Sequence, residues 1–161
     1  MNLICTFVYI LGCISFIIVV GGATYEHLAI VPVWASAVPA SLSMFQGDFP
    51  IAAQRFWIPA HPISLLLLTA SLILNWKSKR RNAILAGLVG YLAVLIITFV
   101  YFVPELMAIT RSTYSPGVDN VLTQRAGTWE SLSLMRLGFL YAMAVIFLFG
   151  LSTRTDSENS R

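Results

Sequence analysis

A short basic segment between two long apolar stretches constrains the fold of this chain more than any other feature. The segment from Trp76 to Arg81 holds four of the ten lysine and arginine residues. Short loops rich in Lys and Arg stay on the cytoplasmic side when the flanking segments insert into a membrane. The sequence therefore predicts a cytoplasmic turn here, with one membrane crossing before it, one after it, and a further crossing beyond each.

This arrangement predicts an all-α integral membrane four-helix bundle with both termini in the cytoplasm. The crossings form a single domain over residues 1–152, and residues 153–161 form a short polar cytoplasmic tail. With 58% hydrophobic and 11% charged residues, the chain is too apolar for a soluble domain of 161 residues. The formal charge of +3 comes mainly from the basic turn, so we expect contact with membrane lipids and no nucleic-acid binding. The expected location is a bacterial inner membrane.

The first crossing is expected from Leu3 to Gly22, about twenty apolar residues that can span the hydrocarbon as one helix. No basic region precedes it, which favours a retained anchor over a cleaved signal peptide. Cys5 and Cys13 are too far apart along one helix to form a disulfide. The polar residues from Thr24 to His27 come directly after this crossing, at the extracytoplasmic interface.

The connection from Leu28 to Ala60 is predicted to form short helices that lie on the bundle. Pro39 to Gln46, followed by Gly47, has the Pro-first and Gly-last pattern of one helix. A second short piece is expected from Phe49 to Trp57, with its aromatic rings at the level of the lipid headgroups.

The second and third crossings flank the basic turn. The second is expected from His61 to Trp76, which is short for a full span unless Phe56 to Ala60 continues it. The third is expected from Ala83 to Val103. Pro104 is expected to kink this helix, which then continues outside the membrane.

The fourth helix is expected to begin at a cap formed by Asp119 or Asn120 and to run unbroken to Leu151. Its first three turns stand outside the membrane. The third and fourth helices are therefore both expected to extend beyond the bilayer.

One face of the fourth helix carries two arginines and a tryptophan at helical spacing: Arg125, Trp129, Leu132 and Arg136. Arg136 lies inside an apolar stretch, where a charge is costly and normally faces a partner in the bundle. One interpretation pairs Arg136 with a carboxylate of another helix, with Glu26 favoured over Glu105. The other is an arginine that extends along the helix toward the membrane surface.

Depth counted from the predicted turns brings several polar residues to similar levels. His61 is level with Thr98, and Arg136 falls close to the same level. Glu105 is level with Gly127, further out. The count predicts a polar extracytoplasmic half and an apolar cytoplasmic half.

Two histidines and three carboxylates distributed over four helices are compatible with a metal or haem site. However, the Glu-x-x-His signature of di-iron bundles is absent. The alternative is a set of buried Glu to Arg ion pairs that hold the helices in register. The sequence therefore assigns no metal ligand and leaves the cofactor unknown.

The chain resembles the anthrone-oxygenase-like family of small four-helix membrane proteins, which is largely a domain of unknown function. The residues that carry the resemblance span nearly the whole chain: Pro32, Trp34 and Phe45 after the first helix, Pro104-Glu105-Leu106 after the third, and Trp129 with Arg136 seven residues later. In that family an Asn commonly follows the proline, where this chain has Glu105. Some members oxidise polycyclic anthrones to quinones without a recognised cofactor, so the resemblance implies an oxygenase-like oxidoreductase.

Three functions remain open for such a chain. The first is a membrane oxidoreductase or oxygenase-like enzyme whose pocket lies in the extracytoplasmic half and binds a flat lipophilic small molecule. Its proton-transfer candidates are Tyr25, Glu26, His27, His61, Tyr101 and Glu105, and its binding candidates are Trp34, Phe45, Trp129 and Arg136.

The second function is a noncatalytic binding or assembly subunit that presents Trp34, Phe45 and Trp57 to lipid or to another membrane protein. A homo-oligomer or a larger membrane complex stays open in either case. The third, a transporter, fits least, because four short helices leave little room for alternating access.

Overall fold

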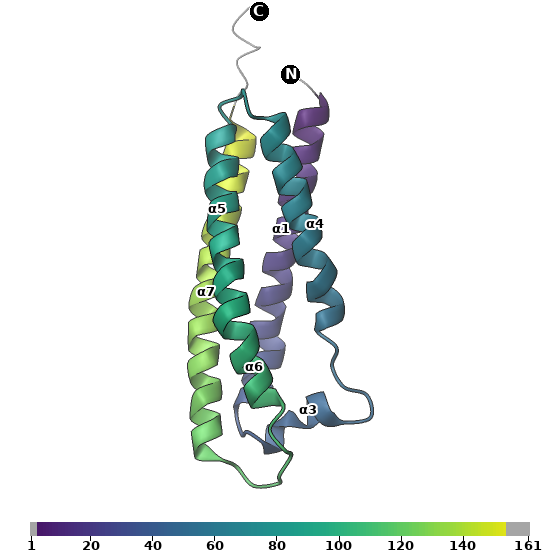
Figure 1. Ribbon diagram of the computed structural model, residues 1–161, viewed down its shortest axis with the longest axis vertical. Helices are drawn as coiled ribbons and strands as arrows, with labels where there is room; N and C mark the ends of the chain where they lie inside the picture. Colours follow the sequence, from purple (N-terminus) through teal and green to yellow (C-terminus); the bar gives the residue numbers. More distant parts are fainter. Residues whose placement is uncertain (1–2, 154–161) are drawn as a thin grey trace, which may run out of the picture.

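The chain forms a bundle of four long helical stretches, seen in a computed structural model that describes residues 3–153 (Figure 1). The first stretch is α1 (Leu3–Tyr25), η1 (Glu26–Ile30) and α2 (Val31–Ala35), the second is α4 (Gln54–Leu74), the third is α5 (Arg81–Ile97), η3 (Thr98–Phe102) and α6 (Val103–Thr110), and the fourth is α7 (Asn120–Ser152). Each of the four is long and apolar enough to cross a membrane. The structure therefore confirms the predicted all-α bundle of four helices that are each able to cross a membrane.

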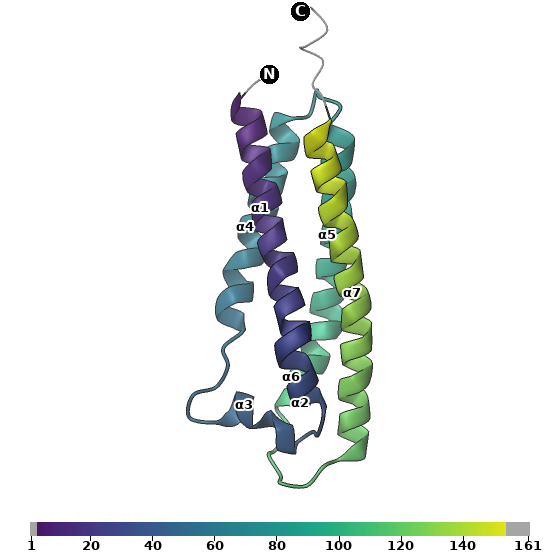
Figure 2. The same ribbon diagram turned by 180° about the vertical axis from the view of Figure 1, so that it is seen from behind.

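The ends of the helices also agree with the sequence signals. The turn between α4 and α5 lies at the same end of the bundle as the start of α1 and the end of α7 (Figures 1 and 2). Asp119 caps α7 as predicted, because its Oδ1 accepts hydrogen bonds from the backbone N–H groups of Val121 at 2.8 Å and Leu122 at 3.1 Å. Apart from Thr153, the predicted polar tail lies outside the described residues.

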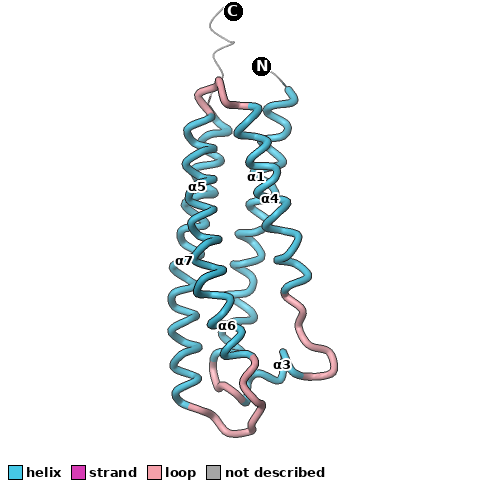
Figure 3. Tube along the Cα trace, in the orientation of Figure 1, coloured by secondary structure: helices cyan, strands magenta, loops and turns pink. Residues whose placement is uncertain are grey.

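The connections at the opposite end are longer, and the one between α2 and α4 contains short helices (Figure 3). The predicted helix at residues 39–46 is present as a 3-10 turn, η2 (Ala40–Leu42), followed by α3 (Ser43–Gln46). This connection is tied to the one before α7, because the Val38 N–H donates to Thr123 Oγ1 at 3.1 Å and the Asp119 N–H donates to the Val38 carbonyl at 2.8 Å. We call the half of the bundle that includes this end the far half.

Two boundaries in this region differ from the prediction. Residues 28–35 do not form a separate surface helix, because the first helix continues through them to Ala35. The predicted short piece from Phe49 to Trp57 is also wrong, since α4 begins at Gln54 and includes Trp57. This earlier start makes the second crossing 21 residues long, enough for a full span.

A π-helical turn interrupts both the first and the third helix, and a proline stands just after each turn. In η1 the Val31 N–H bonds to the Glu26 carbonyl, and in η3 the Val103 N–H bonds to the Thr98 carbonyl. Pro32 and Pro104 come next. A proline ring clashes with the carbonyl four residues earlier, and in both helices that carbonyl lies in the middle of the π turn. The widened turn therefore lets each helix continue past its proline.

The core has two parts, and polar residues lie at their junction. The first part lies between the long helices and contains large buried side chains such as Tyr9, Phe16 and Tyr91. Here α5 and α7 approach so closely that a methyl group at Gly87 would lie 2.5 Å from the Phe147 ring. The second part lies in the far half and is built around two buried tryptophans, Trp34 and Trp129.

Candidate functional site

The far half contains a group of polar and aromatic side chains that we call the polar layer. Its members come from all four long helices: Glu26, His27, Trp57, His61, Thr98, Phe102, Trp129, Ser133 and Arg136. About twenty helical residues span the hydrocarbon, so counting from the basic turn puts its far boundary close to Tyr101 in the third helix and Leu132 in α7. On this count Arg136 lies about 6 Å inside the boundary.

Arg136 is held by hydroxyl groups and an aromatic ring. Its Nη1 donates to Thr98 Oγ1 at 3.0 Å, and its Nη2 donates to Ser133 Oγ at 2.8 Å. The guanidinium carbon lies 4.2 Å from the centre of the Phe102 ring, which is a cation–π contact. No residue from 3 to 153 forms an ion pair with Arg136. The predicted direct pairing with a carboxylate is therefore wrong.

Glu26 is the carboxylate whose charge interacts with Arg136 through space. Its Oε1 accepts a hydrogen bond from Trp57 Nε1 at 2.8 Å, which holds the carboxylate toward α4. Glu105 is occupied elsewhere, because it forms a bidentate ion pair with Arg125 in which both N–O distances are 2.9 Å. The competing partners explain why neither carboxylate reaches Arg136.

His27 is buried, with 7% of its surface exposed, and one of its ring nitrogens has no partner. Nδ1 lies 2.8 Å from the Ala23 carbonyl oxygen, which can only accept, so Nδ1 carries a hydrogen. In the neutral ring Nε2 then presents a lone pair, and no hydrogen-bond donor among residues 3–153 reaches it. The ring stacks almost parallel to Trp129, with 6.5 Å between ring centres. His27 therefore offers a buried proton acceptor.

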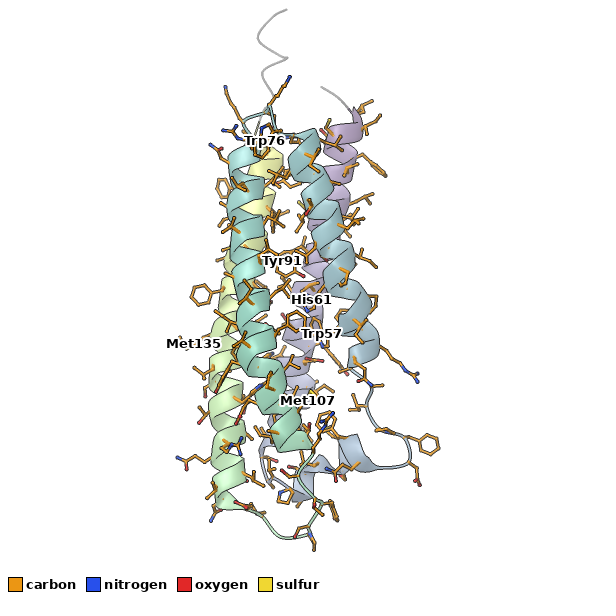
Figure 4. The ribbon with its side chains drawn as sticks, viewed as in Figure 1. Trp57, His61, Trp76, Tyr91, Met107 and Met135 are labelled. Atoms are coloured by element: carbon orange, nitrogen blue, oxygen red, sulfur yellow. The ribbon has the colours of Figure 1, made fainter. Side chains whose placement is uncertain are left out.

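His61 lies between the helices and contacts two aromatic side chains. Its Nδ1 is 2.7 Å from the hydroxyl of Tyr91, and its ring stacks on Trp57 with 5.2 Å between centres. The charge of Arg136 also acts on His61 through space. Figure 4 shows Tyr91, His61 and Trp57 one below another between α4 and α5. The predicted common level of Thr98 and Arg136 agrees with their hydrogen bond, whereas His61 bonds to Tyr91, seven residues before Thr98.

Trp129 connects the polar layer to the core of the far half. Its Nε1 donates to the backbone carbonyl of Phe102 at 2.9 Å, in the π turn η3. Trp34 packs against Trp129, with 5.5 Å between ring centres, and Phe45 packs against Trp34 at 6.1 Å. Trp34 is only 2% exposed. Trp34 and Phe45 thus form part of the core against which Trp129 packs. Because Trp34 is buried, it is not available to a partner protein.

Tyr101 and Glu105 lie outside the polar layer. They line a superficial hollow between the third helix and α7, together with Arg125. Arg125 is eleven residues from Arg136 along α7, which corresponds to about 16 Å. Tyr25, the remaining proton-transfer candidate, is 63% exposed on α1. Of the predicted site residues, His61, Trp129 and Arg136 thus lie in the polar layer, whereas Tyr101 and Glu105 lie in this hollow.

Four residues of the layer were not assigned to the site from sequence: Trp57, Phe102, Ser133 and Thr98. Trp57 and His61 are four residues apart, and Ser133 and Arg136 are three apart, so helical spacing places each pair on one face. That spacing was a usable signal for Trp57 and Ser133. Phe102 is likewise four residues after Thr98, so the same spacing was a signal for it.

No group of three or more His, Cys, Asp or Glu side chains in residues 3–153 is arranged to hold a metal ion. Comparisons with models of protein families, with characterised proteins and with solved structures found no match. The likeness to the anthrone-oxygenase-like family therefore stays a prediction from the residues that carry it.

Proposed function

We propose that this protein binds a flat, lipophilic molecule bearing oxygen substituents in the polar layer, and that it transfers protons to or from that molecule. In this proposal the far half is the extracytoplasmic half, both termini are cytoplasmic, and the membrane is the inner membrane of a bacterium. The observation that carries it is Arg136, a charged side chain in an apolar stretch that contacts no carboxylate of residues 3–153 and lies beside aromatic rings.

The unused hydrogen-bonding capacity of Arg136 supports an oxygen-bearing ligand. A guanidinium has five N–H donors, and the contacts with Thr98 and Ser133 occupy two of them. A charge inside the hydrocarbon is costly unless it is compensated. A carbonyl or phenolate oxygen of a ligand would accept from the remaining donors and offset part of that cost.

The neighbouring aromatic rings favour a flat ligand. Phe102, Trp57 and Trp129 lie around the polar groups and make stacked or edge-on contacts within the protein. Sites for lipophilic small molecules combine aromatic walls with a few polar groups that fix the orientation. A planar ring system with one or two oxygen atoms matches this combination.

The chemistry that this layer would perform is proton abstraction next to a ligand oxygen. His27 Nε2 and His61 are imidazoles, and the unprotonated nitrogen of a neutral imidazole can accept a proton. Arg136 would stabilise the negative charge that forms on the oxygen. This step is what an oxygenase-like oxidoreductase, as implied by the family resemblance, would need from the protein. Glu26, held by Trp57, would exchange the proton with the far surface.

The alternative of a noncatalytic assembly subunit has less support, because it relied on aromatic residues presented to a partner. Trp34 is buried, and Trp57 packs on His61 and Phe56. The alternative becomes the better one if the purified protein fails to bind a planar aromatic ketone such as anthrone.

Anthrone binding to the purified protein in mild detergent tests the proposal. We expect anthrone to quench tryptophan fluorescence in a saturable manner, and Arg136→Leu to weaken binding at least about tenfold, which corresponds to ~1.4 kcal/mol. Arg111→Gln, which removes an exposed arginine outside the layer, is the control and should bind as the wild type does. Unsaturable quenching, or equal affinity of Arg136→Leu and wild type, would refute the proposal.

Turnover is tested separately with His61→Gln. If His61 is the base that removes a proton from anthrone, the protein-dependent oxidation of anthrone by dissolved O2 to the quinone and water should be abolished, while binding and the melting temperature stay close to wild type. A large loss of melting temperature with unchanged relative turnover would make His61 a structural residue. The optical spectrum and the metal content of the same preparation would identify any bound cofactor.

A further inference from the structure

A second polar site lies on the lateral surface of the far half, outside the polar layer. It is a hollow of about 290 Å³ between the third helix and α7. Its lining residues are Tyr101, Glu105, Val121, Gln124, Arg125 and Thr128. The ion pair between Glu105 and Arg125 contributes one charge of each sign to this hollow.

The depth of the hollow matches the lipid headgroups. Counted from the basic turn, Tyr101 lies at the far boundary of the hydrocarbon, Glu105 and Thr128 lie about 6 Å beyond it, and Arg125 lies about 10 Å beyond it. The headgroup layer is roughly 5–7 Å thick on each side of the hydrocarbon. Glu105 and Thr128 therefore lie at the level of the headgroups and Arg125 lies at their outer edge, while the edge of the hollow at Tyr101 meets the acyl chains.

The chemistry of the hollow is suited to a ligand with two opposite charges. Arg125 uses Nε and Nη2 for Glu105, so its Nη1 group keeps its donors. Each carboxylate oxygen of Glu105 retains a further lone pair. Arg125 and Glu105 remain 45% and 24% exposed at their side chains. A phosphate on the Arg125 side and an ammonium on the Glu105 side would extend the ion pair into a four-charge cluster.

The surroundings favour a lipid over a soluble compound. The side chains exposed toward the basic turn are apolar on both helices, including Ile97 at 53%, Leu132 at 39% and Met135 at 64%. Acyl chains would cover this surface. The volume lies at the lower end of the range for small-molecule pockets, which suits a headgroup better than a polycyclic ligand.

We propose that this hollow binds the headgroup of a zwitterionic phospholipid with a primary amine, of the phosphatidylethanolamine type. The phosphate contacts Arg125, and the ammonium donates hydrogen bonds to Glu105. A quaternary ammonium has no N–H group, so a phosphatidylcholine with the same acyl chains lacks the second contact. This inference is independent of a ligand in the polar layer.

Native mass spectrometry of the detergent-solubilised protein tests the proposal with palmitoyl-oleoyl phosphatidylethanolamine as the probe. We expect one lipid to be retained per chain, and the matching phosphatidylcholine to bind about tenfold more weakly, equivalent to ~1.4 kcal/mol. Glu105→Gln and Arg125→Gln should each reduce retention of phosphatidylethanolamine to about the phosphatidylcholine level. Equal retention of the two lipids by the wild type would overturn the proposal.

Three controls keep the result specific. Glu130→Gln and Arg111→Gln make the same charge changes outside the hollow and should retain the lipid as the wild type does. Thr128→Trp fills the hollow without altering the ion pair, so it should block retention even if the ion-pair variants fail to fold. Soluble phosphoethanolamine should not compete at equal concentration. Full competition, or stronger retention of the anionic phosphatidylglycerol, would contradict a zwitterionic lipid site.

Discussion

At the scale of single residues, two arginines in this bundle satisfy their charge in different ways. Arg80 is 5% exposed at the basic turn and donates to Thr6 Oγ1 at 3.0 Å, to the Leu151 carbonyl at 3.1 Å and to the Thr153 carbonyl at 3.2 Å. The two carbonyls belong to the negative end of the α7 helix dipole, so the contacts are complementary in charge. Arg136, by contrast, contacts hydroxyls and a ring and keeps free donors. Arg80 therefore fits a structural role, and the free donors of Arg136 are the basis of its proposed binding role.

Arg80→Ala should lower the free energy of unfolding by roughly 2–4 kcal/mol, because three hydrogen bonds from a charged group are lost at once. Unfolding in mixed micelles, followed by circular dichroism, measures the change. Arg80→Lys should restore only part of the stability, since an ammonium group lacks the planar fork that reaches several acceptors.

The control for this prediction is Arg81→Ala, which removes the adjacent arginine and its cation–π contact with Trp76 at 5.5 Å. Its cost should be no more than ~1 kcal/mol, as is usual for exposed charges. Equal losses of unfolding free energy in Arg80→Ala and Arg81→Ala would show that the buried hydrogen bonds of Arg80 do not stabilise this turn.

At the scale of elements, the two π turns direct equivalent positions toward Arg136. Glu26 and Thr98 each begin a π turn, and each stands six residues before a proline. Thr98 bonds to Arg136 directly, and Glu26 interacts with it through space. π turns are frequent at functional sites because the extra residue redirects side chains and backbone groups. The two π turns therefore place Thr98 and Glu26 toward Arg136 in the polar layer.

Deletion of Val100 should be tolerated by the fold. Val100 lies in η3 and is 74% exposed, and removal of one residue converts a π turn to a regular α turn without rotating the rest of the helix. We expect a folded, monodisperse protein by size-exclusion chromatography that has weakened anthrone binding, because the narrower turn brings Thr98 and Phe102 closer along the helix and shifts their contacts with Arg136.

Deletion of Val89 is the matched control. Val89 is 57% exposed in the regular part of α5, so its loss rotates the remainder of the helix by about 100° and misplaces the core. This variant should aggregate. If both deletions aggregate, or if the Val100 deletion binds anthrone as well as the wild type does, the role given to η3 is wrong.

At the scale of the whole molecule, the charge distribution predicts the orientation in the membrane. The basic turn, the start of α1 and the end of α7 share one end, and the long connections share the other (Figure 1). Lys77 and Arg81 are exposed at the first end, where anionic headgroups would attract them. The second end carries the polar layer and the hollow beside it.

Cysteine labelling tests this orientation in intact cells. In a chain with Cys5 replaced by Ser and Cys13 by Ala, a cysteine introduced by Ser78→Cys should react with a membrane-impermeant maleimide only after the cytoplasmic side is exposed. A cysteine introduced by Gly117→Cys should react from outside. The reversed pattern would place the polar layer in the cytoplasmic half of the membrane.

The sequence by itself determined the helices and most of their ends, because those signals are local. Long apolar stretches define the four crossings, the Asp119 cap begins α7, and Gly47 comes directly after the short α3 helix, as expected. Counting residues from the turns also placed Arg136 level with Thr98, since helical rise is nearly constant.

Only the tertiary structure decided which side chains meet. At the π turn η3, Tyr101, a predicted site residue, is exposed, and its neighbour Phe102 is buried against Arg136. The partner of a carboxylate depends on every group within its reach. Glu26 was therefore held by Trp57 and Glu105 by Arg125, and Arg136 was left with donors to spare.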